Sequence, residues 1–416
     1  MGDFQGCRFR KEIEMDYSLT FEQKAIQKVA RDFAAKEIAP VVNKYENEGI
    51  FPRHIIRRMG EMGFLGCAFP EAYGGSELGF ITMVLIIEEI TKVMMSLGSA
   101  WNMNAMTCPY AILNWGTEEQ KQKYIGPLIS GEKIGYMALT EPGGGSDVVG
   151  AMKTRAVRDG DYYVINGSKM FITLATEADW GLLYCKTDPN AGHAGVSGFI
   201  IETATPGFKA TRIPTVGLGK AIPTCEIALE DVRVHTDNLL GKEGQGFMIA
   251  MQALDFGRIT VAARSLGLAQ ACLDASLKYC NEREAFGQKI GKFQMVQRLI
   301  AESVVEVDAA RLLLYRVAYL MDCGNVPTRE SSIAKYYCAE TAYKAAQAAI
   351  EIFGGYGCCE EFPIARYLNQ AQIARTGEGS ANIQRSIIAQ DALGWKKADK
   401  GIKRKIKLKT DIEPAE

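Results

Sequence analysis

Three segments of the chain combine glycines with hydroxyl and carboxylate side chains. They are Leu139-Thr-Glu-Pro-Gly-Gly-Gly-Ser-Asp147, Glu351-Ile-Phe-Gly-Gly-Tyr-Gly357 and Gly377-Glu-Gly-Ser-Ala-Asn-Ile383. Glycines let a backbone approach a flat cofactor, and Ser or Thr supplies hydrogen bonds to it. For any one of these segments alone, an ordinary turn is the commoner explanation. Their joint occurrence favours an enzyme that binds an organic cofactor.

Other chemistries lack the residues that they need. The chain has only three histidines, His54, His193 and His235, and none lies beside a suitable nucleophile. This argues against triad hydrolysis and histidine-bound metals, so we predict no metal site. The sequence contains neither a GxxxxGK[ST] loop nor a strand-GxGxxG-helix unit. P-loop and classical nicotinamide folds are therefore disfavoured.

Composition narrows the possible partners and the compartment. The formal net charge of −1 provides no field that would recruit nucleic acid or an anionic membrane. Apolar runs fall far short of the ~20 residues that span a bilayer. The polar N-terminus has no apolar signal region, and the eleven cysteines show neither CxxC nor metal-type spacing. We therefore predict a cytoplasmic protein with reduced thiols and no membrane span.

The 416 residues exceed what one hydrophobic core normally serves, and two or three regions are expected. Helical periodicity precedes a stretch of short β-branched and aromatic runs, and long helical periods then return. The β runs, which suggest a small antiparallel sheet or barrel, are residues 161–165, 181–185, 198–201 and 224–229. The clearest helices are expected over residues 81–93, 100–115, 250–281, 293–323 and 332–353.

These patterns divide the chain into an N-terminal extension, a helical domain, a β-barrel domain, a C-terminal four-helix bundle and a basic tail. The predicted boundaries are 1–16, 17–132, 133–240, 241–395 and 396–416. The tail carries eight Lys or Arg residues between 396 and 409. We interpret it as a solvated terminus in preference to a contact with a partner or membrane surface.

Several motifs, in order and spacing, resemble the acyl-CoA dehydrogenase family from about residue 17 to residue 395. They are Leu139-Thr-Glu-Pro with Gly145-Ser-Asp147, Asn166-Gly-Ser-Lys-Met-Phe-Ile-Thr173, Glu230-Asp-Val-Arg-Val234, Arg283-Glu-Ala-Phe-Gly287, Phe293-Gln294, Gly354-Gly-Tyr-Gly357 and Glu378-Gly-Ser-Ala-Asn-Ile-Gln384. The resemblance implies a mostly α fold with a central β domain. It also implies a homotetramer that carries one FAD per subunit.

The resemblance assigns cofactor and substrate contacts residue by residue. Expected contacts to the flavin of the same subunit are Leu139, Thr140, Phe171, Ile172, Thr173, Ser380 and Asn382. Expected contacts to the FAD of a neighbouring subunit are Arg283, Phe286, Gln294, Gly354 and Gly355. Expected substrate contacts are Ser146, Asp255, Arg258, Gly377 and Gly379.

Glu378 matches the family's common catalytic base. A thioester α-proton is weakly acidic, so its removal needs a carboxylate whose pKa is raised by burial. The resemblance implies hydride transfer from Cβ to flavin N5 and an electron-transfer flavoprotein as acceptor. Some relatives place the base on the helix that here holds Gly257, which leaves Glu378 as the candidate. Two other possibilities are an acyl-CoA oxidase and a non-catalytic scaffold that has lost FAD.

The substrate is less defined. Gly377 replaces the common Tyr before the base, which suggests room for a branched, cyclic or aryl-substituted acyl chain. The chain is similar to benzylsuccinyl-CoA and cyclohexanecarboxyl-CoA dehydrogenases, and Arg375 could bind a second carboxylate. Glutaryl-CoA relatives have an arginine near Gly98, and none occurs over residues 94–103. A short straight or glutaryl-type acyl-CoA remains the alternative.

Overall fold

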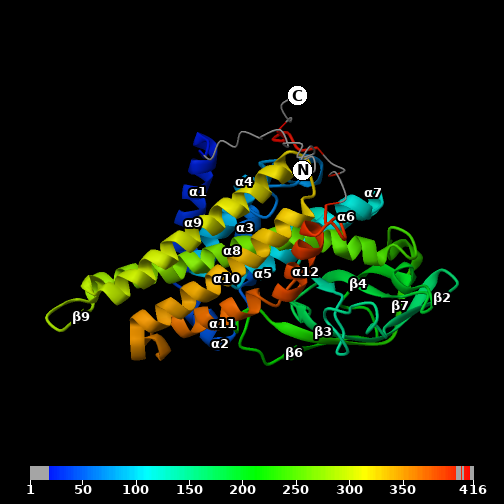
Figure 1. Cartoon of the computed structure of the whole chain (residues 1–416). Coiled ribbons are helices and arrows are strands. Elements are labelled where there is room, and N and C mark those ends of the chain that lie inside the picture. The colour runs from blue at the N-terminus through cyan, green and yellow to red at the C-terminus, as the bar shows by residue number, and fades with distance from the viewer. Residues whose placement is uncertain (1–17, 400–403, 405–406, 413–416) are drawn as a thin grey trace, which may run out of the picture.

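The computed structural model describes residues 18–399, 404 and 407–412. The predicted extension over residues 1–16 lies outside this part of the chain. Within it, a helical region, a β region and a second helical region follow one another in sequence (Figure 1). The predicted order of helical, β and helical regions is confirmed.

Helices form the first region. Capping boxes define two helix starts: Thr20 with Gln23 begins α1, and Thr117 with Gln120 begins α7. The predicted helix over 100–115 contains a π-helical turn, Met103–Thr107, so it is divided into α5, η3 and α6. The elements are α1 (Phe21–Phe33), η1 (Ala34–Ile38), α2 (Val42–Glu48), α3 (Arg53–Glu61), η2 (Glu71–Tyr73), α4 (Gly79–Val93), α5 (Leu97–Asn102), η3 (Met103–Thr107), α6 (Cys108–Trp115) and α7 (Glu118–Ile129).

The β region forms one eight-stranded sheet with the order β6-β7-β3-β2-β4-β5-β8, and β1 pairs with β4. Most pairs are antiparallel as expected, but β1 and β2 each run parallel to β4. Alternating burial along β7 shows that one face packs on the core. The strands are β1 (Gly135–Ala138), β2 (Arg155–Asp159), β3 (Tyr162–Thr173), β4 (Trp180–Lys186), β5 (Val196–Glu202), β6 (Phe208–Ile213), β7 (Thr224–His235) and β8 (Leu239–Leu240).

Long helices dominate the third region. α8 is buried along most of its length and packs against α4 and α10, which explains its nearly continuous apolar surface. A short hairpin joins α8 to α9 at the end of the molecule opposite the sheet (Figure 1). The elements are α8 (Gly246–Glu282), β9 (Glu284–Ala285), β10 (Gln288–Lys289), η6 (Ile290–Lys292), α9 (Gln294–Asp322), α10 (Thr328–Phe353), η7 (Gly354–Cys358), α11 (Ile364–Ala374) and α12 (Ala381–Ala392).

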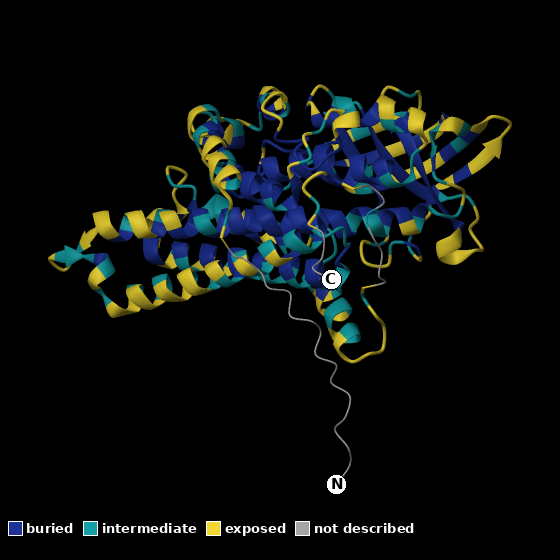
Figure 2. Ribbon diagram, turned by 90° about the horizontal axis from the view of Figure 1, so that it is seen from above, coloured by how far each residue is buried: buried dark blue, intermediate teal, exposed yellow. Residues whose placement is uncertain are grey.

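The buried residues run through the centre of the molecule, and exposed residues cover the outer faces of the helices near the hairpin (Figure 2). No helix in the described part of the chain is long and apolar enough to cross a membrane. The described cysteines are free thiols, and all but Cys323, Cys358 and Cys359 are buried.

The described part of the basic tail packs against the body, so our interpretation of it as a solvated terminus is wrong there. The Arg404 guanidinium lies 5.3 Å from the centre of the Phe80 ring and pairs with Asp411. Leu408 is buried, and Ile412 donates a 2.9 Å backbone hydrogen bond to Asp322. Apolar and paired side chains hold this part of the tail in place where the charge pattern suggested solvent.

Candidate active site

Glu378 lies in the loop between α11 and α12. Its backbone adopts φ of 54°, a left-handed conformation that is costly for a residue with a Cβ. The carbonyl oxygens of Glu378 and Gly379 accept hydrogen bonds from the buried Gln384, and that of Gly379 also accepts one from Lys335. These bonds hold the strained turn, which directs the Glu378 carboxylate inward.

The Glu378 carboxylate is buried against α8. Its Oε2 has no hydrogen-bond partner, and a Cβ added to Gly257 would collide with it. Asn102 of α5 donates a hydrogen bond from its Nδ2 to Oε1. Thr260 in turn donates a 2.6 Å hydrogen bond to Asn102 Oδ1, which fixes the orientation of the amide. One carboxylate oxygen is therefore held in place and the other is free to accept a proton.

Cations surround this carboxylate. Arg264 and Arg258 reach it from α8, and Lys335 reaches it from α10. Burial raises the pKa of Glu378 above its usual value, although these cations and the Asn102 hydrogen bond oppose the rise. Burial also lowers the pKa of Lys335 to about 7. A carboxylate with a raised pKa and a free oxygen can act as a general base near neutral pH.

The predicted CoA contacts Asp255 and Arg258 form a buried ion pair on α8. Thr328 also donates a 3.0 Å hydrogen bond to Asp255. Gly377 and Gly379 flank Glu378, whereas Ser146 is exposed in the loop after β1. Arg375 does not point to a free anion, because it forms a 2.9 Å ion pair with Glu340 and lies over the Tyr343 ring.

The first set of predicted flavin contacts comes together beside β3. Met170 donates a 2.9 Å backbone hydrogen bond to Thr140, and the buried Lys169 bonds both Leu139 O and Glu141. Phe171 interrupts the register of β3 with φ of 59°, and 63% of its surface is exposed. Ile172 is buried in the sheet, and Thr173 ends the strand. The segment thus presents a flat ring and a hydroxyl at one edge, which suits a flavin.

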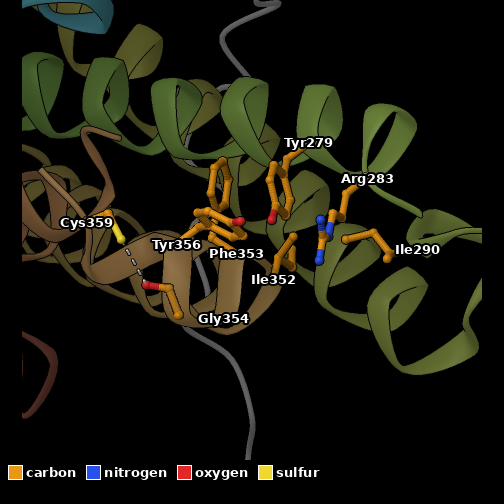
Figure 3. Close-up of a pocket in the computed structure, with 9 residues that line it drawn as sticks. Tyr279, Arg283, Ile290, Ile352, Phe353, Gly354, Tyr356 and Cys359 are labelled. Atoms are coloured by element: carbon orange, nitrogen blue, oxygen red, sulfur yellow. Dashed lines mark hydrogen bonds between the residues drawn. The ribbon is translucent and has the colours of Figure 1, made fainter. Parts of the chain in front are cut away.

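A second set of predicted FAD contacts surrounds a surface cavity of about 490 Å³ at the C-terminal end of α8. Tyr279 of α8 and Arg283, which directly follows α8, point toward Phe353 and Tyr356, and Gly354 and Gly355 line the cavity (Figure 3). A Cβ on either glycine would meet no atom within 4 Å, so the backbone there is open to a ligand.

Two further members of that set are exposed nearby. Phe286, at the tip of the hairpin, is 96% exposed with φ of 51°, and Gln294 begins α9. The hairpin that carries Phe286 lies at the end of the molecule opposite the sheet that contains β3 and Phe171 (Figure 1). The two sets of predicted FAD contacts therefore lie in different parts of the molecule.

Ser380 and Asn382 lie at the start of α12. The Ser380 hydroxyl accepts a 3.4 Å bond from Ile383 N as the N-cap, and Asn382 Oδ1 accepts a 2.9 Å bond from Arg385.

Sequence reasoning missed Asn102, Arg264 and Lys335, all of which act on Glu378. A charged residue inside the apolar run Ile259-Thr-Val-Ala-Ala-Arg-Ser-Leu266 is a signal that could have identified Arg264. Gly98 is close to it: a Cβ there would lie 2.7 Å from Arg264 Cβ. An arginine from α8 thus lies next to Gly98, in the segment 94–103 that has no arginine of its own.

Comparisons with known proteins agree with this geometry. Family models for the acyl-CoA dehydrogenase N-terminal, middle and C-terminal domains match residues 20–132, 136–232 and 244–393. Glutaryl-CoA dehydrogenase of Desulfococcus multivorans is 42% identical over 93% of this chain and all of its own length. The short-chain specific acyl-CoA dehydrogenase of Clostridium acetobutylicum is 38% identical over 90% of this chain and 99% of its own.

Solved structures of other proteins are also similar to this chain. A glutaryl-CoA dehydrogenase in complex with glutaryl-CoA superposes with a TM-score of 0.91 at 42% identity, covering 94% of this chain and all of the other. A chain from the structure of the electron transferring flavoprotein of Acidaminococcus fermentans has a TM-score of 0.89 at 41% identity, covering 91% and 100%. The chain therefore belongs to the acyl-CoA dehydrogenase family of FAD-dependent oxidoreductases.

Proposed function

We propose that this enzyme oxidises an acyl-CoA thioester to its 2-enoyl-CoA with Glu378 as the base for the α-proton. The observation that carries the proposal is the buried Glu378 carboxylate, whose Oε2 has no partner. Removal of an α-proton needs a carboxylate of raised pKa that is not already hydrogen-bonded on the accepting oxygen. Glu378 meets both conditions.

Each residue around Glu378 has a separate role in the proposed proton transfer. Asn102 holds Oε1, so Oε2 is the oxygen that takes the proton. Gly257 leaves the space that this oxygen occupies, and the oxygen itself is buried. Arg264 and Lys335 keep the pKa of Glu378 from rising further, so that enough carboxylate remains ionised. FAD, when bound, supplies the acceptor for the hydride that leaves Cβ.

The cofactor sites suggest how the subunits assemble. Leu139, Thr140 and the segment Phe171–Thr173 would hold the flavin, together with Ser380 and Asn382. The cavity of Arg283, Gly354 and Gly355 would receive FAD from a neighbouring subunit, with Phe286 and Gln294. Apolar side chains exposed along α9 and its hairpin support such an interface, and we propose a homotetramer. They are Phe286, Met295, Val304, Val305 and Leu312.

An electron-transfer flavoprotein is the proposed electron acceptor, supported by the similarity to a chain in a structure that concerns such a protein. An acyl-CoA oxidase would pass electrons to oxygen instead. Measuring peroxide formation against reduction of an electron-transfer flavoprotein separates the two.

For the acyl group, we propose a chain with a branch, a ring or an aryl substituent beside the reacting carbons, because Gly377 places no side chain there. Benzylsuccinyl-CoA and cyclohexanecarboxyl-CoA are examples. The alternative is a short straight or glutaryl-type acyl-CoA, which is favoured by the names of relatives at 42% and 38% identity.

The test is turnover of a panel of acyl-CoAs with a ferricenium acceptor, with the enoyl-CoA product identified by mass. Oxidation of at least one member supports the activity, and the order of kcat/KM values identifies the acyl class. A protein that retains FAD but oxidises no acyl-CoA would contradict the proposal.

A further inference from the structure

Arg264 is a buried cation that makes no direct ion pair in the described part of the chain, although Glu378 acts on it electrostatically. It is 5% exposed, and its Nη1 donates a hydrogen bond to Ser99 Oγ. Its Nε has no hydrogen-bond partner. Within the described residues, no carboxylate lies within ion-pair distance of its guanidinium. Burying an unpaired charge costs several kcal/mol by general estimates, so this arrangement calls for an anion from outside the chain.

Two other buried cations in the described part of the chain each form an ion pair with a carboxylate. Lys169 lies 2.9 Å from Glu141, and Arg258 pairs with Asp255. Lys335 instead donates a 2.8 Å hydrogen bond to Gly379 O beside the base. Around Glu378, Arg258 is already paired with Asp255, and burial lowers the pKa of Lys335 to about 7, so Arg264 is the cation that keeps its charge without a direct ion pair. An additional anion would balance this charge.

Two glycines shape the position of the Arg264 side chain. A Cβ on Gly98 would stand 2.7 Å from Arg264 Cβ and 3.2 Å from its Cδ, so the side chain passes where Gly98 leaves space. At the other end, Arg264 Nη2 lies 3.7 Å from the position of a Cβ on Gly377. Gly377 directly precedes the base. The guanidinium is thus held beside the place where the reacting carbons must lie.

We propose that Arg264 binds a carboxylate on the acyl chain, so that the substrate is the CoA thioester of a dicarboxylic acid. This inference rests on the proposed function, because Glu378 as base fixes where the acyl chain lies. A guanidinium presents parallel N–H groups that match both oxygens of a carboxylate. Arg264 is then a residue that determines specificity.

A simpler role for Arg264 would be to tune the charge of Glu378. In that case its loss would affect charged and uncharged acyl chains alike. If it binds a carboxylate, only chains that end in one should lose affinity. The comparison must therefore use ligands that differ in this group alone.

The probes are succinyl-, glutaryl- and adipyl-CoA, each paired with its ω-monoamide. Binding to the FAD-loaded Glu378→Gln variant, which prevents turnover, is followed through the flavin absorbance. For the best-fitting chain length we expect the carboxylate to bind about 10- to 100-fold more tightly than the amide, as for a hydrogen bond to a charged group. Adding Arg264→Gln should abolish this preference, and Arg264→Lys should keep part of it.

Arg375→Gln is the matched control, because Arg375 is paired with Glu340 and should leave the preference unchanged. No preference at any chain length would overturn the inference, as would a preference that survives Arg264→Gln or equal losses for both ligands. If the wild type oxidises only uncharged acyl-CoAs, the inference fails and the proposed function stands. If it oxidises none, the proposed function fails, and the binding comparison still decides the role of Arg264.

Discussion

The carboxylate of Glu378 occupies the space that a side chain on Gly257 would fill, although the two residues lie on different elements. Gly257 lies inside α8, where glycine is unfavourable for a helix by about 1 kcal/mol relative to alanine. The position of the base therefore depends on the absence of a methyl group there.

Gly257→Ala should slow turnover while leaving the fold intact. The new methyl group would displace Glu378, and overpacking of this kind costs about 1–3 kcal/mol, or about 5- to 150-fold if it falls on the rate. Steady-state kcat and thermal unfolding of the FAD-loaded protein are the measurements. Gly126→Ala is the control, because its nearest neighbour would lie at 3.6 Å and α7 should tolerate it. Unchanged kcat in Gly257→Ala would contradict the placement of Glu378.

Lys335→Met should move the acidic limb of the pH profile to higher pH. The base works when deprotonated, so kcat/KM rises as pH passes through the pKa of Glu378. Lys335 lowers that pKa, and its removal should let burial raise the pKa further. Lys344→Met on the same helix removes an exposed lysine that pairs with Glu306 at 2.6 Å, and should leave the limb in place. A shift to lower pH, or none, would refute the coupling.

The raised pKa of Glu378 also makes its contribution to folding stability depend on pH in a defined direction. Because the folded state binds this proton more tightly than the unfolded chain does, the contribution of Glu378 to stability is present at low pH. It is lost as pH rises through the folded-state pKa. Glu378→Gln should remove this dependence.

Arg283→Ala should weaken both FAD retention and subunit assembly, because a ligand held across an interface stabilises both. Arg283 lines the cavity beside Tyr356, 5.6 Å from the centre of that ring. Flavin content after gel filtration and mass by light scattering are the readouts. Arg57→Ala, which removes an exposed arginine from α3, serves as the control. A variant with full flavin content and unchanged mass would rule out the shared site.

Much of the fold could be predicted because its signals are local. The long apolar period predicted a helix over 250–281, and α8 spans Gly246–Glu282. The strands β1, β2, β6 and β8 were not predicted, since they are short or, like β6, have mostly exposed residues without a clear alternation of apolar side chains.

The site was predictable only in part. Resemblance identified Glu378, but the pairing of Gly98 with Arg264 depends on the packing of α5 against α8. No spacing in the sequence reveals that Asn102 would meet Glu378 across 276 positions. Arg375 was a reasonable expectation from its closeness in sequence, but Glu340 neutralises it.

The central claim is that Glu378 removes the α-proton, and the rate of flavin reduction in Glu378→Gln tests it most directly. Anaerobic stopped-flow mixing with the best substrate of the panel follows bleaching of the oxidised flavin band. Loss of a positioned general base typically costs ~10²–10⁴-fold in rate, and FAD and acyl-CoA binding should remain because Gln is nearly the same shape. Bleaching slowed by that factor with intact binding is the predicted result. Bleaching at a near wild-type rate would contradict the account.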